Sequence, residues 1–257
     1  MSTDSTEPRV PEYHQSAINL FLKCQRQYMF RYEMDIVVQP KSALIVGRAN
    51  DDCNNFNMEQ KIESKTDLKL NEVLDVYNDS FEKNAPGTNW GKDDVGKVKD
   101  KGYQMAAVVH EQCSPNIQPV SVQDKFRIET DEGWAVGGTL DVTDVDDYVR
   151  DLKTSKANYQ DDAIIKGLQP VMYDFAYETK YKKKAKGFIY DIVTKHKEPR
   201  YQKMVGTISS HQRGWLFDII RTMHSQIKAG NFQYASENGW WCSKDWCGYW
   251  SMCKGKK

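Results

Sequence analysis

The sequence predicts a mixed α/β fold in which helices cover both faces of a central mixed sheet. Three observations support this prediction. Apolar residues recur at helical spacing through most of the chain before Pro119, strand-like alternation follows as far as Lys153, and the chain then returns to helix, strand and helix. We find no internal repeat, so we expect one compact domain rather than an array.

The individual elements follow from apolar spacing and turn residues. Ser16 can cap the first helix, and Gly230 can close the last one. We expect helices over residues 16–31, 47–61, 70–82, a segment that ends at 110, 168–180 and 207–228. We expect strands over residues 119–128, 134–142, 148–153 and 187–194, and an extended segment that Pro40 interrupts over residues 37–46.

Length and composition set limits on the class of protein. The chain has 257 residues, and its 36 lysine and arginine residues equal its 36 aspartate and glutamate residues, so net charge gives no sign of a nucleic-acid partner. Residues 1–12 are expected to form a flexible tail before a single domain, 13–257. The start of the chain lacks the apolar region of a signal peptide, and no apolar run approaches membrane-spanning length. We therefore expect a soluble, cytoplasmic protein with no membrane contact.

The segment from Val136 to Lys156 contains the first candidate site. Its two strands flank an aspartate-rich turn, which predicts a β-hairpin and brings Asp141 close to Asp151 and Lys153. Carboxylates gathered in this way bind hard divalent cations such as Mg²⁺, often together with substrate phosphates. The pattern thus suggests metal-assisted attack on a phosphodiester. The alternative is a solvated polar hairpin without any catalytic role.

Cysteine provides the second candidate site. Six cysteines occur, and Cys242, Cys247 and Cys253 all fall in the C-terminal segment 240–257. In a reducing compartment, clustered cysteines indicate a metal more often than a disulfide. Burial of these thiols among tryptophans, without any metal, is the alternative.

A third group follows the hairpin. Gln169 and Tyr173 lie four residues apart on one expected helix face, which can look back at the carboxylates or form a half-buried polar pair. Beyond them, five lysines between residues 180 and 186 interleave with Tyr177 and Tyr181. This run is either a solvated helix end or a grip on a phosphate backbone. The chain lacks the glycine-rich nucleotide motifs, so a helicase activity would have to come from a partner.

Together these motifs resemble the RecB-type branch of the PD-(D/E)XK nuclease superfamily, including compact exonucleases of phage recombination and CRISPR adaptation. The residues that match its G-x-x-D, D-x-K and Q-x-x-x-Y motifs are Asp141, Asp151 with Lys153, and Gln169 with Tyr173. The opening helix resembles that of the branch, with Cys24 in the place of a first iron–sulfur ligand and Cys242, Cys247 and Cys253 in the places of the other three.

The resemblance implies a restriction-endonuclease-like fold with the cysteine-rich tail packed on the N-terminal helix. It implies that Asp141, Asp151 and the main-chain carbonyl of Leu152 hold Mg²⁺ or Mn²⁺, with Lys153 assisting the attack on phosphate. Gln169 and Tyr173 would position the substrate. The four cysteines would hold a structural [4Fe–4S] cluster, or Zn²⁺ as the alternative.

Two positions depart from the family pattern. The family has a histidine four residues after a glycine. In this chain the glycine is Gly47, and the residue four positions later is Asp51, which is either a further metal ligand or a solvated helix residue. The trailing cysteines are spaced C-x4-C-x5-C, with a longer first gap than the common C-x2-C-x5-C.

The expected function is a metal-dependent exonuclease that degrades single-stranded DNA or duplex ends in recombination, repair or phage DNA metabolism. For a viral protein the compartment would be the host cytoplasm. The alternative is a non-catalytic DNA-binding subunit of a recombination complex that retains the nuclease fold. An endonuclease of the same fold is a third hypothesis.

Overall fold

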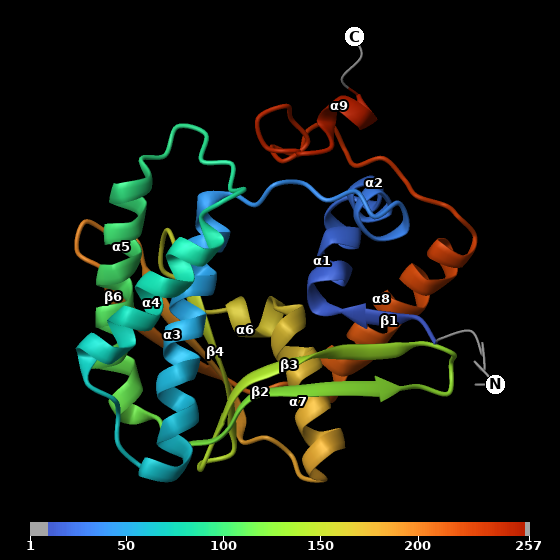
Figure 1. The fold of residues 1–257 in the computed structure, drawn as a ribbon. Coiled ribbons are helices and arrows are strands. Elements are labelled where there is room, and N and C mark those ends of the chain that lie inside the picture. Colours follow the sequence, from blue (N-terminus) through green and yellow to red (C-terminus); the bar gives the residue numbers. More distant parts are fainter. Residues whose placement is uncertain (1–9, 255–257) are drawn as a thin grey trace, which may run out of the picture.

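A mixed sheet forms the centre of the protein, which a computed structural model describes over residues 10–254 (Figure 1). In this part of the chain the sheet has six strands: five follow the order β1-β3-β4-β5-β6, and the sixth, β2, pairs with β3. Pairing is parallel between β1 and β3 and between β4 and β5, and antiparallel elsewhere. The strands are β1 (Glu12–His14), β2 (Pro119–Glu129), β3 (Ala135–Asp144), β4 (Tyr148–Ser155), β5 (Gly187–Thr194) and β6 (Arg200–Gly206).

Helices cover both faces of the sheet, which confirms the predicted fold class. Helices α3, α4 and α5 pack over Val142 and Leu152 on one face, and α1, α7 and α8 pack over Leu140 and Ile192 on the other (Figure 1). Leu140 and Val142 enter different apolar cores, although residues two apart on a regular strand point to the same face. The helical segments are α1 (Gln15–Lys23), α2 (Gln25–Tyr28), η1 (Met29–Glu33), α3 (Ser42–Ser64), α4 (Leu70–Asn84), α5 (Val95–Val108), η2 (Val109–Cys113), η3 (Ser114–Asn116), α6 (Ala163–Lys166), α7 (Leu168–Tyr181), α8 (Ser210–Lys228) and α9 (Trp250–Cys253).

The pairing of β3 creates an opening in the sheet. β2 pairs along one edge of β3 over almost its whole length. On the other edge, β1 pairs with residues 135–137, whereas β4 pairs only with Val142 and Thr143. Residues 138–141 therefore lie where β3 and β4 separate, and Asp141 stands next to the last paired position.

The helix predicted over residues 16–31 is interrupted. α1 ends at Lys23, and Cys24 has an extended backbone (φ −165°, ψ 106°) before α2 and the π-helix η1 continue. Hydrogen bonds from Cys24 N to Leu20 O (2.8 Å) and from Tyr28 N to Cys24 O (3.1 Å) bridge the interruption. The segment contains neither proline nor glycine, so no helix-breaking residue in the sequence predicts this interruption.

Two other expectations from local pattern fail. The extended segment predicted over residues 37–46 is wrong in its second half, because α3 begins at Ser42 and buries Ile45 and Val46. A short apolar run does not distinguish a strand from a buried helix by periodicity alone. Strands β1 and β6 are not predicted at all, since β1 has three residues and β6, a polar edge strand, buries only Met204.

The cysteine-rich tail packs on the N-terminal helical segment, as predicted. The rings of Phe30 and Tyr249 are stacked with their centroids 5.5 Å apart. The Tyr249 hydroxyl donates a hydrogen bond to the carbonyl of Ile36 at 3.0 Å.

The described residues stop short of both ends of the chain. Residues 1–9, most of the expected tail 1–12, lie outside the described residues, as do residues 255–257. Glu12 already belongs to β1, where it pairs with Ala135. No helix in the described part combines the length and the apolar character needed to cross a bilayer.

Candidate active site

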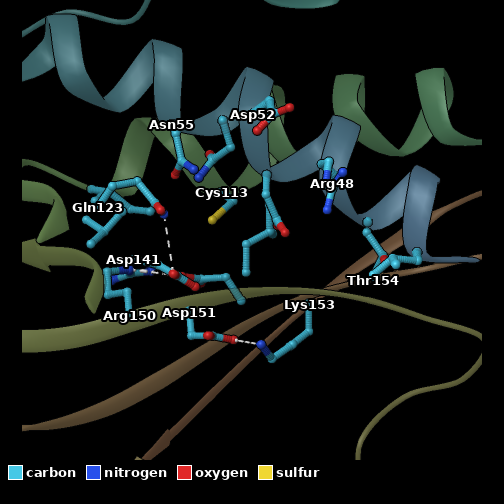
Figure 2. A pocket seen from close by; sticks show the side chains of 18 of the residues that line it. Arg48, Asp52, Asn55, Cys113, Gln123, Asp141, Arg150, Asp151, Lys153 and Thr154 are labelled. Atoms are coloured by element: carbon cyan, nitrogen blue, oxygen red, sulfur yellow. Dashed lines mark hydrogen bonds and ion pairs between the residues drawn. The ribbon is translucent and has the colours of Figure 1, made fainter. Parts of the chain in front are cut away.

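The β3–β4 hairpin and α3 enclose a cavity of about 440 Å³ that contains the predicted catalytic residues. Val142 pairs with Arg150, so continuing the antiparallel register places Asp141 opposite Asp151. The cavity is lined by Asp51, Asp141, Asp151, Leu152 and Lys153 among others. The hairpin predicted from the sequence therefore brings its two carboxylates and its lysine together (Figure 2).

Asp151 is the most enclosed of these acids, with 1% of its surface exposed. The ammonium Nζ of Lys153 lies 2.6 Å from its Oδ2, and Gln169 Nε2 donates to its Oδ1 at 2.5 Å. Burial opposes the charge on Lys153, but the Asp151 carboxylate outweighs that effect and raises the pKa of the lysine. Lys153 is thus a fixed cation at neutral pH.

Asp141 and Asp51 face the same cavity and resist ionisation. Burial, followed by repulsion from Asp151, raises the pKa of Asp141 well above its ordinary value. The same two causes raise the pKa of Asp51 to about 7. Asp51 points to the cavity, whereas its neighbour Asp52 accepts a 2.5 Å hydrogen bond from the hydroxyl of Ser80.

This donor set fits a hard divalent cation in its chemistry. Carboxylate and carbonyl oxygens are the ligands that Mg²⁺ and Mn²⁺ accept, and a bound cation relieves the repulsion that raises these pKa values. Within residues 10–254, no three His, Cys, Asp or Glu side chains are grouped as metal ligands in this conformation. The carboxylates share the cavity without meeting at one point.

Gln169 and Tyr173 both come from α7 but lie differently. Gln169, in the first turn, bonds Asp151 as described. Tyr173 is buried, and its ring packs edge-on against Phe126 with the centroids 6.0 Å apart. Neither side chain is among those that line the cavity. In this structure Gln169 orients a carboxylate, and Tyr173 belongs to the apolar core beneath it.

Gln123 on β2 is a site residue that sequence reasoning missed. Its side-chain Nε2 donates to Asp141 Oδ1 at 3.4 Å, and it lines the cavity (Figure 2). Its backbone has φ +50°, a left-handed conformation inside a strand that costs a non-glycine residue about 1–3 kcal/mol. No sequence signal marks this position, because glutamine carries no preference for such a backbone.

Sequence reasoning also missed a buried ion-pair network, of which Arg150 and Asp191 line the cavity. Arg150 binds Asp191 through Nε and Nη2, both at 2.9 Å, and binds Asp144 through Nη1 at 3.3 Å. The Tyr201 hydroxyl donates to Asp191 at 2.6 Å, and Asp144 also accepts from the backbone N–H of Tyr148 at 3.0 Å. The network fixes the turn and the strand that carry Asp151.

The four cysteines predicted to act together lie around one small cavity between the tail and α2. Its lining includes Cys24, Cys242, Cys247 and Cys253. All four are free thiols, and Cys247 Sγ accepts a 3.3 Å hydrogen bond from Gln27. Burial raises the pKa of Cys247. Thiol sulfurs from both ends of the chain are the donor type that iron–sulfur clusters and structural zinc use.

Lysines of the run at the end of α7 and just after it form ion pairs with aspartates. Lys183 and the Tyr177 hydroxyl both bind Asp147, at 2.5 and 2.9 Å. Lys180 and the Tyr181 hydroxyl both bind Asp124. These contacts favour the solvated-helix-end interpretation for this part of the run over a grip on phosphate.

Comparison with known proteins identifies the fold family. A family model for the PD-(D/E)XK nuclease superfamily matches residues 14–254. The fold is similar to that of a candidate exonuclease from Eubacterium rectale, with a TM-score of 0.60 at 13% identity over 94% of this chain and 92% of that one. The solved structure of SSO0001 gives a TM-score of only 0.42 at 12% identity, over 98% of this chain and 90% of that one.

A search of curated proteins finds no match. At such low identity the Eubacterium rectale structure shows the fold alone. The match of the family model over nearly the whole chain, together with a β-hairpin that brings two aspartates and a lysine to one cavity, decides the family. The chain belongs to the PD-(D/E)XK nuclease superfamily.

Proposed function

We propose that the protein is a Mg²⁺- or Mn²⁺-dependent exonuclease that hydrolyses single-stranded DNA or duplex ends. The observation that carries this proposal is the cavity where Asp51, Asp141, Asp151 and Lys153 converge from α3, β3 and β4. The three carboxylates and the Leu152 carbonyl would hold the cation. When bound, such a cation lowers the pKa of a ligand water and offsets charge on the phosphate.

The protein's own groups divide the remaining work. Lys153, kept protonated by Asp151, acts as a cation towards the scissile phosphate and not as a proton acceptor. Gln169 holds one oxygen of Asp151, so the other oxygen has a fixed direction. Asp51, whose pKa is raised to about 7, would give up a proton on holding a cation near neutral pH.

We further propose that Cys24, Cys242, Cys247 and Cys253 hold a [4Fe–4S] cluster, with Zn²⁺ as the alternative. Their common cavity supports this assignment. Such a cluster would join the two ends of the chain and make residues 13–257 one domain. Visible absorption and iron, sulfide and zinc analysis of protein purified without oxygen distinguish the two metals; absence of all three rejects both.

DNA is the proposed substrate, in recombination, repair or phage DNA metabolism, and any strand separation would come from a helicase partner. The alternative, a non-catalytic DNA-binding subunit, is favoured by one observation, the aspartate at position 51 where the family has histidine.

The deciding experiment is digestion of end-labelled single- and double-stranded DNA with and without Mg²⁺ or Mn²⁺. Lys153→Ala should slow cleavage about 10²–10³-fold, since it removes one charge that stabilises the transition state. Lys203→Ala, which removes an exposed lysine on β6, is the matched control and should cleave normally.

Three outcomes separate the hypotheses. Metal-dependent shortening from a labelled end supports the exonuclease, and cutting of circular single strands indicates an endonuclease. Binding of DNA without any cleavage by intact wild-type protein indicates the non-catalytic subunit.

A further inference from the structure

Two exposed tryptophans stand side by side on the cysteine-rich tail. Trp240 is 64% exposed and Trp246 is 54% exposed, and their ring centroids lie 5.1 Å apart at an interplanar angle of 87°. Single exposed apolar side chains are ordinary, but adjacent large rings left in water commonly mark a binding surface.

A lysine accompanies each of these rings. Lys23, the last residue of α1, places Nζ 5.6 Å from the centroid of Trp240, and Lys41 places Nζ 4.9 Å from the centroid of Trp246. Both lysines are exposed. We refer to Trp240, Trp246, Lys23 and Lys41 as the Trp–Lys platform. Flat rings beside fixed cations offer stacking surfaces for bases and contacts for phosphates.

The platform adjoins the carboxylate cavity through α3. Lys41 immediately precedes α3, and its Nζ also donates to the carbonyl of Asp245 at 3.2 Å. The next turns of α3 carry Leu44, Arg48 and Asp51, which all line the cavity. Asp51 lies ten positions after Lys41, which corresponds to a rise of about 15 Å along the helix. Figure 1 shows the tail beside the segment that enters α3.

We propose that the Trp–Lys platform binds the single-stranded part of the DNA substrate, and that this strand runs along the first turns of α3 to Asp51 and the catalytic cavity. This inference rests on the proposed nuclease function. At about 3.4 Å per stacked nucleotide, the distance of about 15 Å corresponds to four or five nucleotides.

The chemistry favours a single strand over other occupants. A duplex hides its base faces within the stack, whereas a single strand exposes them to aromatic side chains. The exposed Arg48, halfway along α3, adds a positive charge between the platform and the cavity. A strand that spans both regions would be held at one end by stacking and at the other by the catalytic residues.

Equilibrium binding separates the platform from catalysis. In the Lys153→Ala background, fluorescent oligothymidylates of three and twelve nucleotides are titrated against the full chain. Trp240→Ala with Trp246→Ala should weaken binding of the twelve-nucleotide strand at least about fivefold, the loss expected for one unstacked base. Binding of the three-nucleotide strand should not change, because it is too short to reach from the cavity to the platform.

Control variants distinguish a specific loss of DNA binding from a folding defect. Trp240→Phe with Trp246→Phe retains flat rings and should restore most of the binding. Trp215→Ala, which removes a 39% exposed tryptophan on α8, should bind like the parent chain. Lys23→Gln and Lys41→Gln should each reduce the slope of log affinity against log salt by about 1.

The outcomes bear on the two proposals separately. Unchanged binding of the long strand, or equal losses for both strand lengths, overturns the platform. The nuclease function is tested instead by cleavage in the wild-type background. If the platform is wrong, that cleavage continues in the tryptophan variants with the KM for long strands unaltered; if it is right, that KM rises while kcat is retained.

Discussion

The carboxylate cavity and the cysteine-rich tail both present candidate metal ligands, yet the protein holds them in different ways. The cavity is formed by β3, β4 and α3, elements whose other residues belong to the two apolar cores, and its Asp151 is 1% exposed. From residue 230 to residue 254, which covers the described part of the tail and the segment that leads to it, Tyr249 alone is buried, and the short helix α9 buries no residue. One region has a scaffold that exists without metal, and the other has almost no core of its own.

The contrast teaches what each metal would contribute. In the cavity the sheet must hold like charges close together. Their repulsion lowers the stability of the metal-free protein, and a bound cation would relieve it. In the tail a bound metal would supply part of the free energy of folding, as it does in small domains that lack a sufficient core.

The largest expected effect concerns the scaffold of the cavity. Arg150→Met removes the cation that pairs with buried Asp191 and Asp144, and unpaired buried charge should lower the free energy of unfolding by about 3–5 kcal/mol. Urea denaturation measures this change. Arg200→Met, on the exposed start of β6, is the matched control and should stay within about 0.5 kcal/mol of wild type. Equal stabilities of the two variants would contradict the scaffold account.

Sequence reasoning located much of the cavity because its signals are local. The aspartate-rich turn predicted the hairpin, and a two-strand hairpin fixes which residues face each other, so Asp141 and Asp151 could be paired in advance. The helix faces of α4 and α8 follow equally well from their apolar spacing.

The missed features depend on contacts that no local pattern encodes. Arg150 and Asp191 are 41 residues apart, and their pairing exists only because β4 and β5 are neighbours in the sheet. The left-handed backbone of Gln123 is imposed by surroundings that the sequence alone does not reveal. β6 has the polarity of a loop, since pairing with one edge of β5 leaves most of its residues in contact with water.

Ionisation of Asp51 in the metal-free cavity should lower the stability of the protein. The Asp51 carboxyl has a pKa near 4 in an unfolded chain and about 7 in the folded one, so between these values the folded protein binds more protons. The contribution of the Asp51 carboxyl to the free energy of unfolding of metal-free protein should therefore fall as pH rises from about 4 to about 7. Urea midpoints measured with a chelator at several pH values test this.

Asp51→Asn is the diagnostic variant for that pH dependence. It should flatten the decline in stability, although Asp141, with its own raised pKa, leaves part of it. Asp75→Asn, on an exposed position of α4, should follow the wild-type curve. A decline of the same steepness in Asp51→Asn would show that ionisation of this carboxyl does not cause the loss of stability.

A smaller effect on activity should follow when the Asp151 carboxylate loses one hydrogen-bond partner. Gln169→Ala removes the 2.5 Å hydrogen bond to Asp151, and loss of such an orienting partner commonly costs 10–100-fold in metal affinity or activity. Activity titrated with Mn²⁺ measures both quantities. Gln112→Ala, at an exposed position, should titrate like wild type. Wild-type behaviour of Gln169→Ala would mean that the scaffold orients Asp151 without the amide.

The smallest effect on the cavity should come from the tail. Cys253→Ser should abolish thiolate-bound metal, and limited proteolysis should then begin within residues 230–254, because that segment has little else to hold it. The sheet should remain intact, so the kcat for strands too short to reach the tail should change less than about twofold. Cys53→Ser is unsuitable as a control because Cys53 is buried in α3, whereas Ser251→Ala, on the exposed face of α9, changes the tail without removing a thiol. If Cys253→Ser unfolded the whole chain in one step, the two regions would form one cooperative unit, and the metal of the tail would support the catalytic scaffold as well.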